Sequence, residues 1–367
     1  MPVATRTLRV LYLFAGHKRK ADMKHYLTMY GKKNNIKVKV YEVDILRGKR
    51  YDLTSMQRKA RYLNKVKMGA YDVVIASPPC GTFSRARWAN RRGPRPLRLR
   101  HCPRGFPWLT GPQCQGVRLG NDLADFAGSA LKAQFERKTE ENEPDPQGLM
   151  EHPEDLGTVE CGDHPGSIWH FYNIVELLQF DRVEWGALAQ SDFGRPYPKP
   201  TRLLGRFKGF GDLVAIGEPT FDDKGKYLGP LKRNPNIQSM QVGKNSDGKF
   251  GTEATAAWPP ELCKEISKRM VAHFLSADDK AQEKGLSDVQ EVGDGGQELH
   301  EGVPETVHGP PEGDGRGGQV LPDDWSPPCI PPPGYDDEEE DHQGGVGVGK
   351  EGGRSRRYLR WEAIHMG

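Results

Sequence analysis

The chain has 367 residues, a length that permits one large domain or two smaller ones. Only 35% of the residues are hydrophobic and the mean hydropathy is -0.73, so we expect part of the chain to stay outside a packed core. No apolar run reaches the length of a membrane span and the N-terminus lacks a signal-peptide pattern, so we expect neither a membrane protein nor a secreted one.

The charge is distributed unevenly along the chain. Residues 278–350 contain 19 acidic and 4 basic residues, whereas residues 1–277 carry a net charge of +16. A front region this basic suits a polyanionic partner, and nucleic acid is the first candidate. A solvated basic surface is the plainer alternative.

Six cysteines are spread over the chain without a CxxC pair. Their spacing fits neither a disulfide framework nor a zinc site, and His101, Cys102 and Cys114 are at most partial metal ligands. We therefore expect reduced cysteines, no metal site and an intracellular protein. A nuclear location in a eukaryote would follow only from a DNA substrate. The oligomeric state is not readable from the sequence.

Strands and helices alternate over the first 80 residues. Apolar runs at 8–14 and 71–76 are typical of buried strands, and 37–43 alternates as a strand does. Helical spacing covers 23–29 and 53–67. This order predicts an α/β fold with a Rossmann-like, mostly parallel, doubly wound sheet.

The pattern continues after an irregular, basic and aromatic segment at 84–118. The further elements expected are helices at 121–136, 168–179 and 260–275 and strands at 147–151, 183–188 and 201–206. After about residue 278 the periodicity ends. Residues 278–350 are predicted to be a disordered acidic tail rich in Gly and Pro, and residues 351–367 form a basic-aromatic patch.

Three candidate sites follow predicted strands, where an open α/β sheet binds its ligands. The first is the glycine turn Phe14-Ala15-Gly16, and the second is the acidic pair Glu42 and Asp44, placed to accept hydrogen bonds from a ribose. The third is Cys80 after two prolines, a rigid turn that presents a nucleophile. Each has a structural alternative: an ordinary turn, a solvated carboxylate or a buried cysteine.

The third segment resembles a known family. Pro78-Pro79-Cys80 followed by Phe83-Ser84 is similar to the Pro-Pro-Cys-x-x-Phe-Ser signature of DNA cytosine-carbon-5 methyltransferases. Weaker matches in the same order extend the resemblance over about residues 8–275, and residues 194–202 look most like divergent relatives carried by phages and mobile elements. The resemblance implies a class I methyltransferase domain over 1–277, with a reduced target-recognition region at 207–250.

The resemblance also implies a cofactor and roles for individual residues. S-adenosylmethionine would be the cofactor, and cytosine in DNA the substrate. The residues that match the family's cofactor segments are Phe14, Ala15, Gly16, Glu42, Asp44, Asp52 and Pro78. The residues that match its catalytic segments are Cys80, Glu151, Lys199 and Arg202.

Those residue types suit the chemistry that the resemblance implies. Cytosine carbon 5 is a poor nucleophile, and addition of a Cys80 thiolate to carbon 6 would activate it. Glu151 would hold or donate a proton at ring nitrogen 3, and a cation from Lys199 or Arg202 would assist near the base oxygen. The base would have to leave the duplex to reach such a pocket.

The basic segment after Cys80 is a candidate for contact with nucleic acid. Its arginines could grip phosphates, and its aromatic rings could stack on bases. The alternative is a solvated basic insertion. The residues singled out are Arg85, Arg87, Trp88, Arg91 and Arg92.

Two other functions remain open at this point. One is a methyltransferase of the same fold that acts on RNA, for which Cys102 or Cys114 would have to serve as a second cysteine that releases the product. The other is a catalytically dead nucleic-acid-binding module from a mobile-element protein, suggested by the His17–Lys20 run where the family's cofactor loop continues with glycine.

Overall fold

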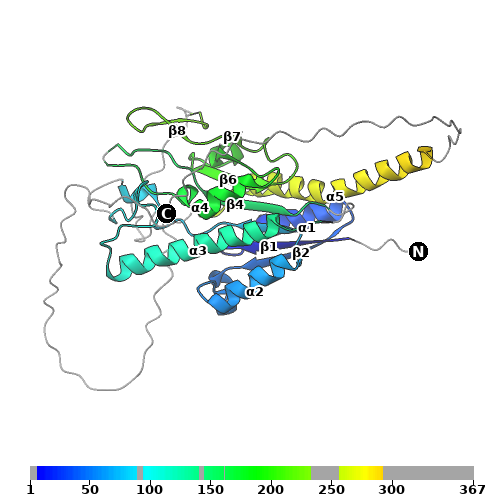
Figure 1. Ribbon diagram of the computed structural model, residues 1–367, viewed down its shortest axis with the longest axis horizontal. Coiled ribbons are helices and arrows are strands. Elements are labelled where there is room, and N and C mark those ends of the chain that lie inside the picture. Colours follow the sequence, from blue (N-terminus) through cyan, green and yellow to red (C-terminus); the bar gives the residue numbers. More distant parts are fainter. Residues whose placement is uncertain (1–5, 89–93, 140–143, 161, 233–255, 292–367) are drawn as a thin grey trace, which may run out of the picture.

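The computed structural model describes residues 6–88, 94–139, 144–160, 162–232 and 256–291 (Figure 1). The strands are β1 (Thr7–Leu13), β2 (Lys37–Val43), β3 (Val73–Ala76), β4 (Gln147–Pro153), β5 (Glu184–Ala189), β6 (Pro200–Arg206), β7 (Ala215–Ile216), β8 (Thr220–Phe221) and β9 (Tyr227–Gly229). The α-helices are α1 (Met23–Lys33), α2 (Met56–Lys67), α3 (Gly111–Phe135), α4 (Tyr172–Val175) and α5 (Pro260–Glu291). The 3-10 helices are η1 (Ile45–Arg47), η2 (Lys49–Tyr51), η3 (Arg85–Trp88), η4 (Ile168–His170), η5 (Glu176–Gln179) and η6 (Gln190–Phe193).

Seven strands form one sheet in the order β2-β1-β3-β4-β6-β5-β7. The first four pair in parallel, and β6 lies antiparallel between β4 and β5, so β5 runs in the same direction as β1 to β4. An antiparallel strand inserted at this point of a doubly wound sheet is the arrangement of class I methyltransferases. The predicted fold class is confirmed.

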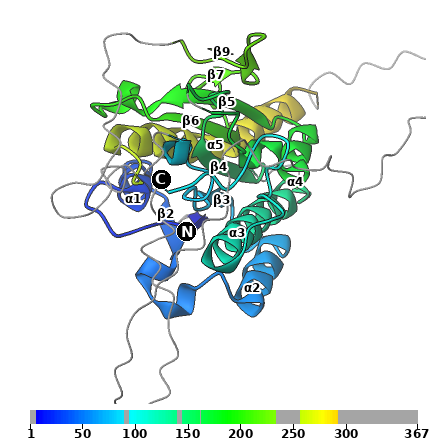
Figure 2. The ribbon, with the colours of Figure 1, turned by 90° about the vertical axis from the view of Figure 1, so that its left-hand side faces the viewer.

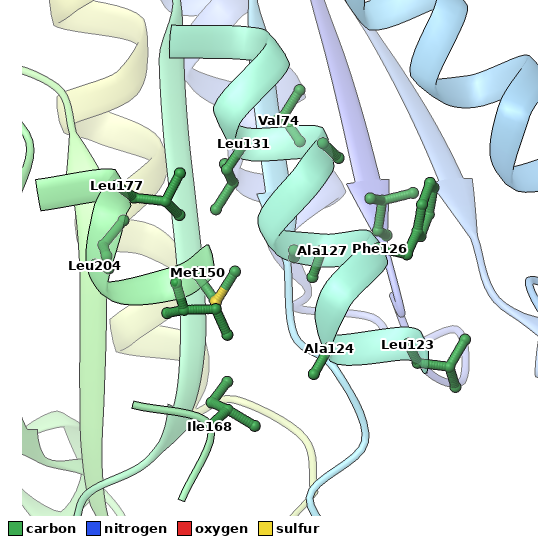
Figure 3. Packing of buried hydrophobic residues seen from close by; sticks show 14 of the residues in the cluster. Val74, Leu123, Ala124, Phe126, Ala127, Leu131, Met150, Ile168, Leu177 and Leu204 are labelled. Atoms are coloured by element: carbon green, nitrogen blue, oxygen red, sulfur yellow. The ribbon is translucent and has the colours of Figure 1, made fainter. Parts of the chain in front are cut away.

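Helices cover both faces of the sheet (Figure 2). On one face α1 and α5 pack against each other, and on the other α3 packs against α2 and α4. Figure 3 shows the second layer, in which Ala124, Ala127 and Leu131 of α3 lie over Met150 of β4 and Leu204 of β6. All five side chains are buried. A strand such as β3, whose four residues are all buried, requires this cover on both faces.

A glycine sets the height of α3 over the sheet. A β-carbon added at Gly148 of β4 would lie 2.4 Å from the ring of Phe135 and 2.8 Å from Leu131. Only glycine lets the helix approach β4 this closely. The same strand carries Glu151, so this packing positions a predicted catalytic residue.

Three predicted helix limits are wrong. Helix α3 begins ten residues before the predicted start, because its first turns are rich in glycine and lack apolar spacing. The predicted helix at 168–179 is broken into η4, α4 and η5. Helix α5 continues past 275 to Glu291, into the segment predicted to be disordered, because Ala, Gln, Glu and Lys extend a helix after its apolar stripe ends (Figure 1).

The rest of the acidic tail and the basic-aromatic patch at 351–367 lie outside the described residues. So does most of the second half of the region 207–250. Among the described helices, none combines the length and the apolar character that crossing a membrane requires.

Candidate active site

A cavity of about 290 Å³ opens at the carboxyl ends of β1, β3 and β4. Ligands of open α/β sheets bind at this edge because the loops there are brought together by parallel strands. The lining residues come from the loops after β1, β2 and β3, from β4, from the segment before β6 and from the segment before α5. They are Tyr12, Phe14, Ala15, Gly16, His17, Arg19, Asp44, Leu46, Ser77, Pro78, Pro79, Cys80, Glu151, Pro153, Lys199, Ala256, Ala257 and Trp258.

The loop after β1 is held in a sharp turn by Asp44. Its carboxylate accepts hydrogen bonds from the backbone N–H groups of Gly16 (2.8 Å) and Leu46 (2.8 Å). Arg47 donates to the Gly16 carbonyl oxygen at 2.6 Å. Phe14 has φ 59° and Gly16 has φ 63°, both in the left-handed region. A non-glycine residue held there is strained, and such strain concentrates at binding sites.

The three acids predicted to bind the cofactor are placed differently. Asp44 lines the cavity. The Glu42 carboxylate lies outside it, paired with Arg47 at 2.8 Å and Lys24 at 3.4 Å. Asp52 also lies outside the cavity lining, where it accepts a hydrogen bond from the backbone N–H of Thr54. Of the three, only Asp44 is brought to the same cavity as Cys80.

Cys80 is half-buried and its thiol is free. The turn that presents it is closed by a 2.9 Å hydrogen bond from the Phe83 N–H to the Cys80 carbonyl oxygen. Desolvation raises the pKa of the Cys80 thiol, Lys199 lowers it, and Glu151 raises it further. The positive charge of Lys199 thus favours the reactive thiolate form of Cys80.

Glu151 of β4 is 7% exposed and faces the cavity. Burial raises the pKa of its carboxyl, while Lys199 and a hydrogen bond from Trp258 lower it. The net shift is upward, so Glu151 keeps its proton at a higher pH than an exposed glutamate does. A carboxylic acid of this kind can donate a proton to a ligand.

Lys199 and Arg202 have different positions although three residues separate them. Lys199 has φ 34° and lines the cavity. Arg202 lies outside the cavity lining, with a side chain 0% exposed. Its guanidinium forms a bidentate pair with Glu154 (2.6 and 2.8 Å) and donates to the Gly217 carbonyl oxygen (2.7 Å). Arg202 thus ties β6 to the segments after β4 and β7.

Loss of the Lys199 charge should make Cys80 less reactive at neutral pH. In Lys199→Met the thiol loses the largest influence that lowers its pKa, so the pKa should rise above that of the wild type. We expect the pH midpoint of Cys80 alkylation by iodoacetamide, followed by peptide mass spectrometry, to move upward. Lys67→Met, at the other end of the sheet, is the matched control. An unchanged midpoint in Lys199→Met would contradict this electrostatic assignment.

Loss of Arg202 should destabilise the fold. Arg202→Met leaves the buried Glu154 without its charge partner, and breaking a buried pair costs about 3–5 kcal/mol. Urea unfolding measures this loss. The double variant with Glu154→Gln should recover a large part of it, and a loss below about 1 kcal/mol in the single variant would show that the pair is not needed for stability.

The predicted nucleic-acid contacts at Arg85 and Arg87 are turned toward the protein. Arg85 donates to the carbonyl oxygens of Gly157 and Thr158 (2.8 Å to the latter). Arg87 donates to Gly81 (2.9 Å) and Arg95 (3.1 Å) carbonyl oxygens. Both guanidiniums therefore hold loops in place. Of the other predicted contacts, Trp88 is half-buried in η3, and Arg91 and Arg92 lie outside the described residues.

Several residues at the cavity were not predicted as site residues. Tyr12 was assigned only to a strand, yet it lines the cavity beside Trp258, with ring centroids 6.0 Å apart. Arg19 belongs to the basic run after β1 and donates to the Trp258 carbonyl oxygen at 2.7 Å. The sequence offered one signal for Trp258: residues 256–261, just before the last predicted helix, resemble the closing cofactor motif of DNA cytosine-carbon-5 methyltransferases.

Arg98 supports the loop after Cys80 from behind. It is buried, its guanidinium lies 3.7 Å from the centre of the Phe83 ring, and it donates to Thr82 Oγ1 (2.9 Å). Desolvation lowers the pKa of Arg98 to about 9. Nothing in the local sequence distinguishes Arg98 from the exposed arginines around it, so its burial could not be predicted.

The cysteines need one correction. Cys102 is disulfide-bonded, so the expectation that all six are reduced is wrong. Cys102 is buried with Leu97, Leu99 and Phe106, and Cys114 packs against the same cluster. Neither residue lines the cavity that contains Cys80.

Comparison with known proteins adds little. No protein-family model and no curated protein matches this chain. A search of solved structures finds the Dnmt2 methyltransferase of S. pombe, at 15% sequence identity and a TM-score of 0.27. The match covers 54% of this chain and spans only 50% of the Dnmt2 chain.

Proposed function

We propose that this protein is an S-adenosylmethionine-dependent methyltransferase that methylates carbon 5 of cytosine in DNA through a covalent bond from Cys80. One observation carries the proposal: Cys80, Glu151 and Lys199 line the same cavity as the glycine turn after β1 and Asp44. A nucleophile, a carboxyl with a raised pKa and a cation are the groups that this reaction needs.

The cavity suits the cofactor chemically. Each carboxylate oxygen of Asp44 accepts one hydrogen bond from a backbone N–H group. Each therefore keeps a further lone pair that can accept a hydrogen bond from a ribose hydroxyl. The turn at Phe14 to Gly16 brings backbone to the cavity wall, and Pro78 closes it from β3. The volume lies near the lower end of the range for ligand pockets, about 300–1,000 Å³. When bound, S-adenosylmethionine supplies an electrophilic methyl group.

The side chains of the cavity would divide the remaining chemistry. The Cys80 thiolate, stabilised by Lys199, forms a bond to carbon 6 of cytosine. Glu151 donates its proton to ring nitrogen 3, so that the electron pair released into the ring reaches carbon 5 without a build-up of negative charge. After methylation the carbon 5 proton leaves to a base, the Sγ–carbon 6 bond breaks and the thiolate is restored. The proton on ring nitrogen 3 returns to Glu151, so the product is neutral and the carboxylic acid is regenerated.

One feature favours DNA over RNA as the substrate. The net charge of +16 on residues 1–277 suits either polyanion. The RNA alternative, however, calls for a second cysteine beside Cys80, and neither Cys102 nor Cys114 lines the cavity. Because Cys80 and Glu151 line the same cavity, an active enzyme is favoured over a catalytically inactive binding module.

Trapping of the covalent adduct tests the proposal. DNA that carries 5-fluorocytosine cannot lose a proton from carbon 5, so the enzyme should stay attached after methyl transfer. We expect a denaturation-resistant protein–DNA complex that requires S-adenosylmethionine and Cys80, and that fails to form with Cys80→Ser. A complex that forms equally with this variant, or none with folded wild-type protein, would refute the proposed chemistry.

A further inference from the structure

We infer that Asp155, His164 and His170 form a binding site for one divalent first-row transition-metal ion, separate from the methyl-transfer cavity. Among the described residues these three present carboxylate and imidazole ligand atoms within 4.8 Å of one another. None of them lines the cavity around Cys80. The sequence predicted no metal site.

The three residues converge from different parts of one long connection. Asp155 follows β4, His164 lies in the loop and His170 ends η4. His164 Nε2 lies 2.7 Å from Asp155 Oδ1 and 2.9 Å from Oδ2, and His170 Nε2 lies 3.0 Å from Oδ2. Both rings thus present the same nitrogen to one carboxylate.

The two imidazole-to-carboxylate separations fit neighbouring ligand positions around one ion. With ligand bonds of about 2.0–2.1 Å, they correspond to angles of roughly 80–95° at the metal. Two imidazoles and one carboxylate are a recurring ligand set for divalent iron and zinc, with the remaining positions open to water. Asp155 and His164 are buried, whereas His170 is partly exposed and leaves a route for the ion.

Neighbouring contacts fix the ligands in place. The Gly157 N–H donates to Asp155 Oδ1 at 3.0 Å, and the Arg100 N–H donates to the His164 carbonyl oxygen at 2.9 Å. The ring of Phe221 packs edge-on against His164, with centroids 4.9 Å apart. Outer contacts of this kind orient metal ligands and shield the ion from water.

The position of the cluster indicates a structural role. Fourteen residues connect β4 to η4, and the described ones, 154–160 and 162–167, belong to no helix or strand, which makes the connection long for a compact domain. The Thr158 N–H donates to the Gly225 carbonyl oxygen at 2.8 Å, and Phe221 and Gly225 belong to the β8–β9 ribbon. A bound ion would hold this connection against the ribbon. Arg85, which follows the Cys80 turn in sequence, contacts the same connection at Gly157 and Thr158.

Metal content of the untagged full-length protein is the first test. We expect about one equivalent of metal by plasma mass spectrometry after purification, or after titration of chelator-stripped protein with Zn²⁺, Fe²⁺, Mn²⁺ or Co²⁺. Bound Co²⁺ should give the weak absorption of an octahedral ion. His164→Ala and His170→Ala should each lower the affinity at least about 10-fold, and His25→Ala, an exposed histidine on α1, should leave it unchanged.

Thermal unfolding keeps the test independent of how the variants fold. The melting temperature of stripped wild-type protein should rise by several degrees when metal is added in large excess over its dissociation constant. Folded wild-type protein that binds none of the four ions at micromolar concentration would overturn the inference and leave a carboxylate hydrogen-bonded by two imidazoles. Unchanged binding by the His164→Ala/His170→Ala double variant would also overturn it. Neither result depends on methyl transfer.

Discussion

Replacement of Cys80 by serine should lower the rate of methyl transfer at least about 10³-fold while leaving the fold intact. A serine hydroxyl is far less acidic than a thiol, so it supplies almost no anion to attack carbon 6 at neutral pH. The side chain is half-buried at the cavity wall and differs from serine by one atom, so the substitution should cost little stability.

Steady-state turnover with labelled S-adenosylmethionine and DNA measures this loss. Cys114→Ser is the matched control, because Cys114 is also a free, half-buried cysteine but lies outside the cavity. It should keep the wild-type rate. If the Cys80 variant kept more than about a tenth of the wild-type rate, Cys80 would not be the nucleophile.

Replacement of Glu151 by glutamine should lower the rate by about 10²- to 10³-fold and change its pH dependence. Glutamine fills the same space and can still donate a hydrogen bond, but it cannot transfer a proton. Because its pKa is raised, Glu151 keeps its proton to a higher pH than an exposed glutamate, and wild-type activity should fall as the pH rises through that pKa. The variant should lack this alkaline limb.

A pH profile of kcat for both proteins tests this assignment. Glu184→Gln, at the exposed start of β5, is the matched control and should leave the profile unchanged. A Glu151→Gln enzyme with the wild-type rate and the wild-type alkaline limb would remove Glu151 from the mechanism.

Much of the fold could be predicted because its signals are local. The buried runs at Val73–Ala76 and Thr7–Leu13 read as parallel strands from their apolar residues alone, and strand β2 was predicted with its observed limits. The end of α5 could not be predicted in the same way, because the apolar stripe stops at 275 whereas the backbone continues as helix to Glu291. The apolar stripe predicts only the part of the helix that packs on the core. Residues of high helix propensity continue the helix beyond that stripe.

The site was predictable where motif and strand end coincide. Cys80 and Asp44 follow strands, Glu151 lies near the end of β4 and Lys199 stands just before β6. All four line one cavity. Arg202 shows the limit of this reasoning. It lies three residues from Lys199, yet its guanidinium pairs with Glu154 and does not face the cavity. Because Glu154 is 48 residues away, no local sequence pattern predicts this pair.

The cluster of Asp155, His164 and His170 was missed for a related reason. Spacings of nine and six residues match none of the compact metal-binding motifs, so the sequence alone gives three isolated polar residues. Only the path of the loop between β4 and η4 brings their ligand atoms together. Contacts built by irregular backbone are the ones that periodicity cannot reveal.

The most direct test of the proposed activity is the chemical position of the transferred methyl group. Purified protein would be incubated with isotopically labelled S-adenosylmethionine and either unmethylated genomic DNA or total RNA, and the digested nucleosides would be separated by mass spectrometry. We predict label on carbon 5 of deoxycytidine, absent with Cys80→Ser. Label confined to ribonucleosides, label on the exocyclic nitrogen of cytosine, or bound nucleic acid without any label would contradict the proposed function.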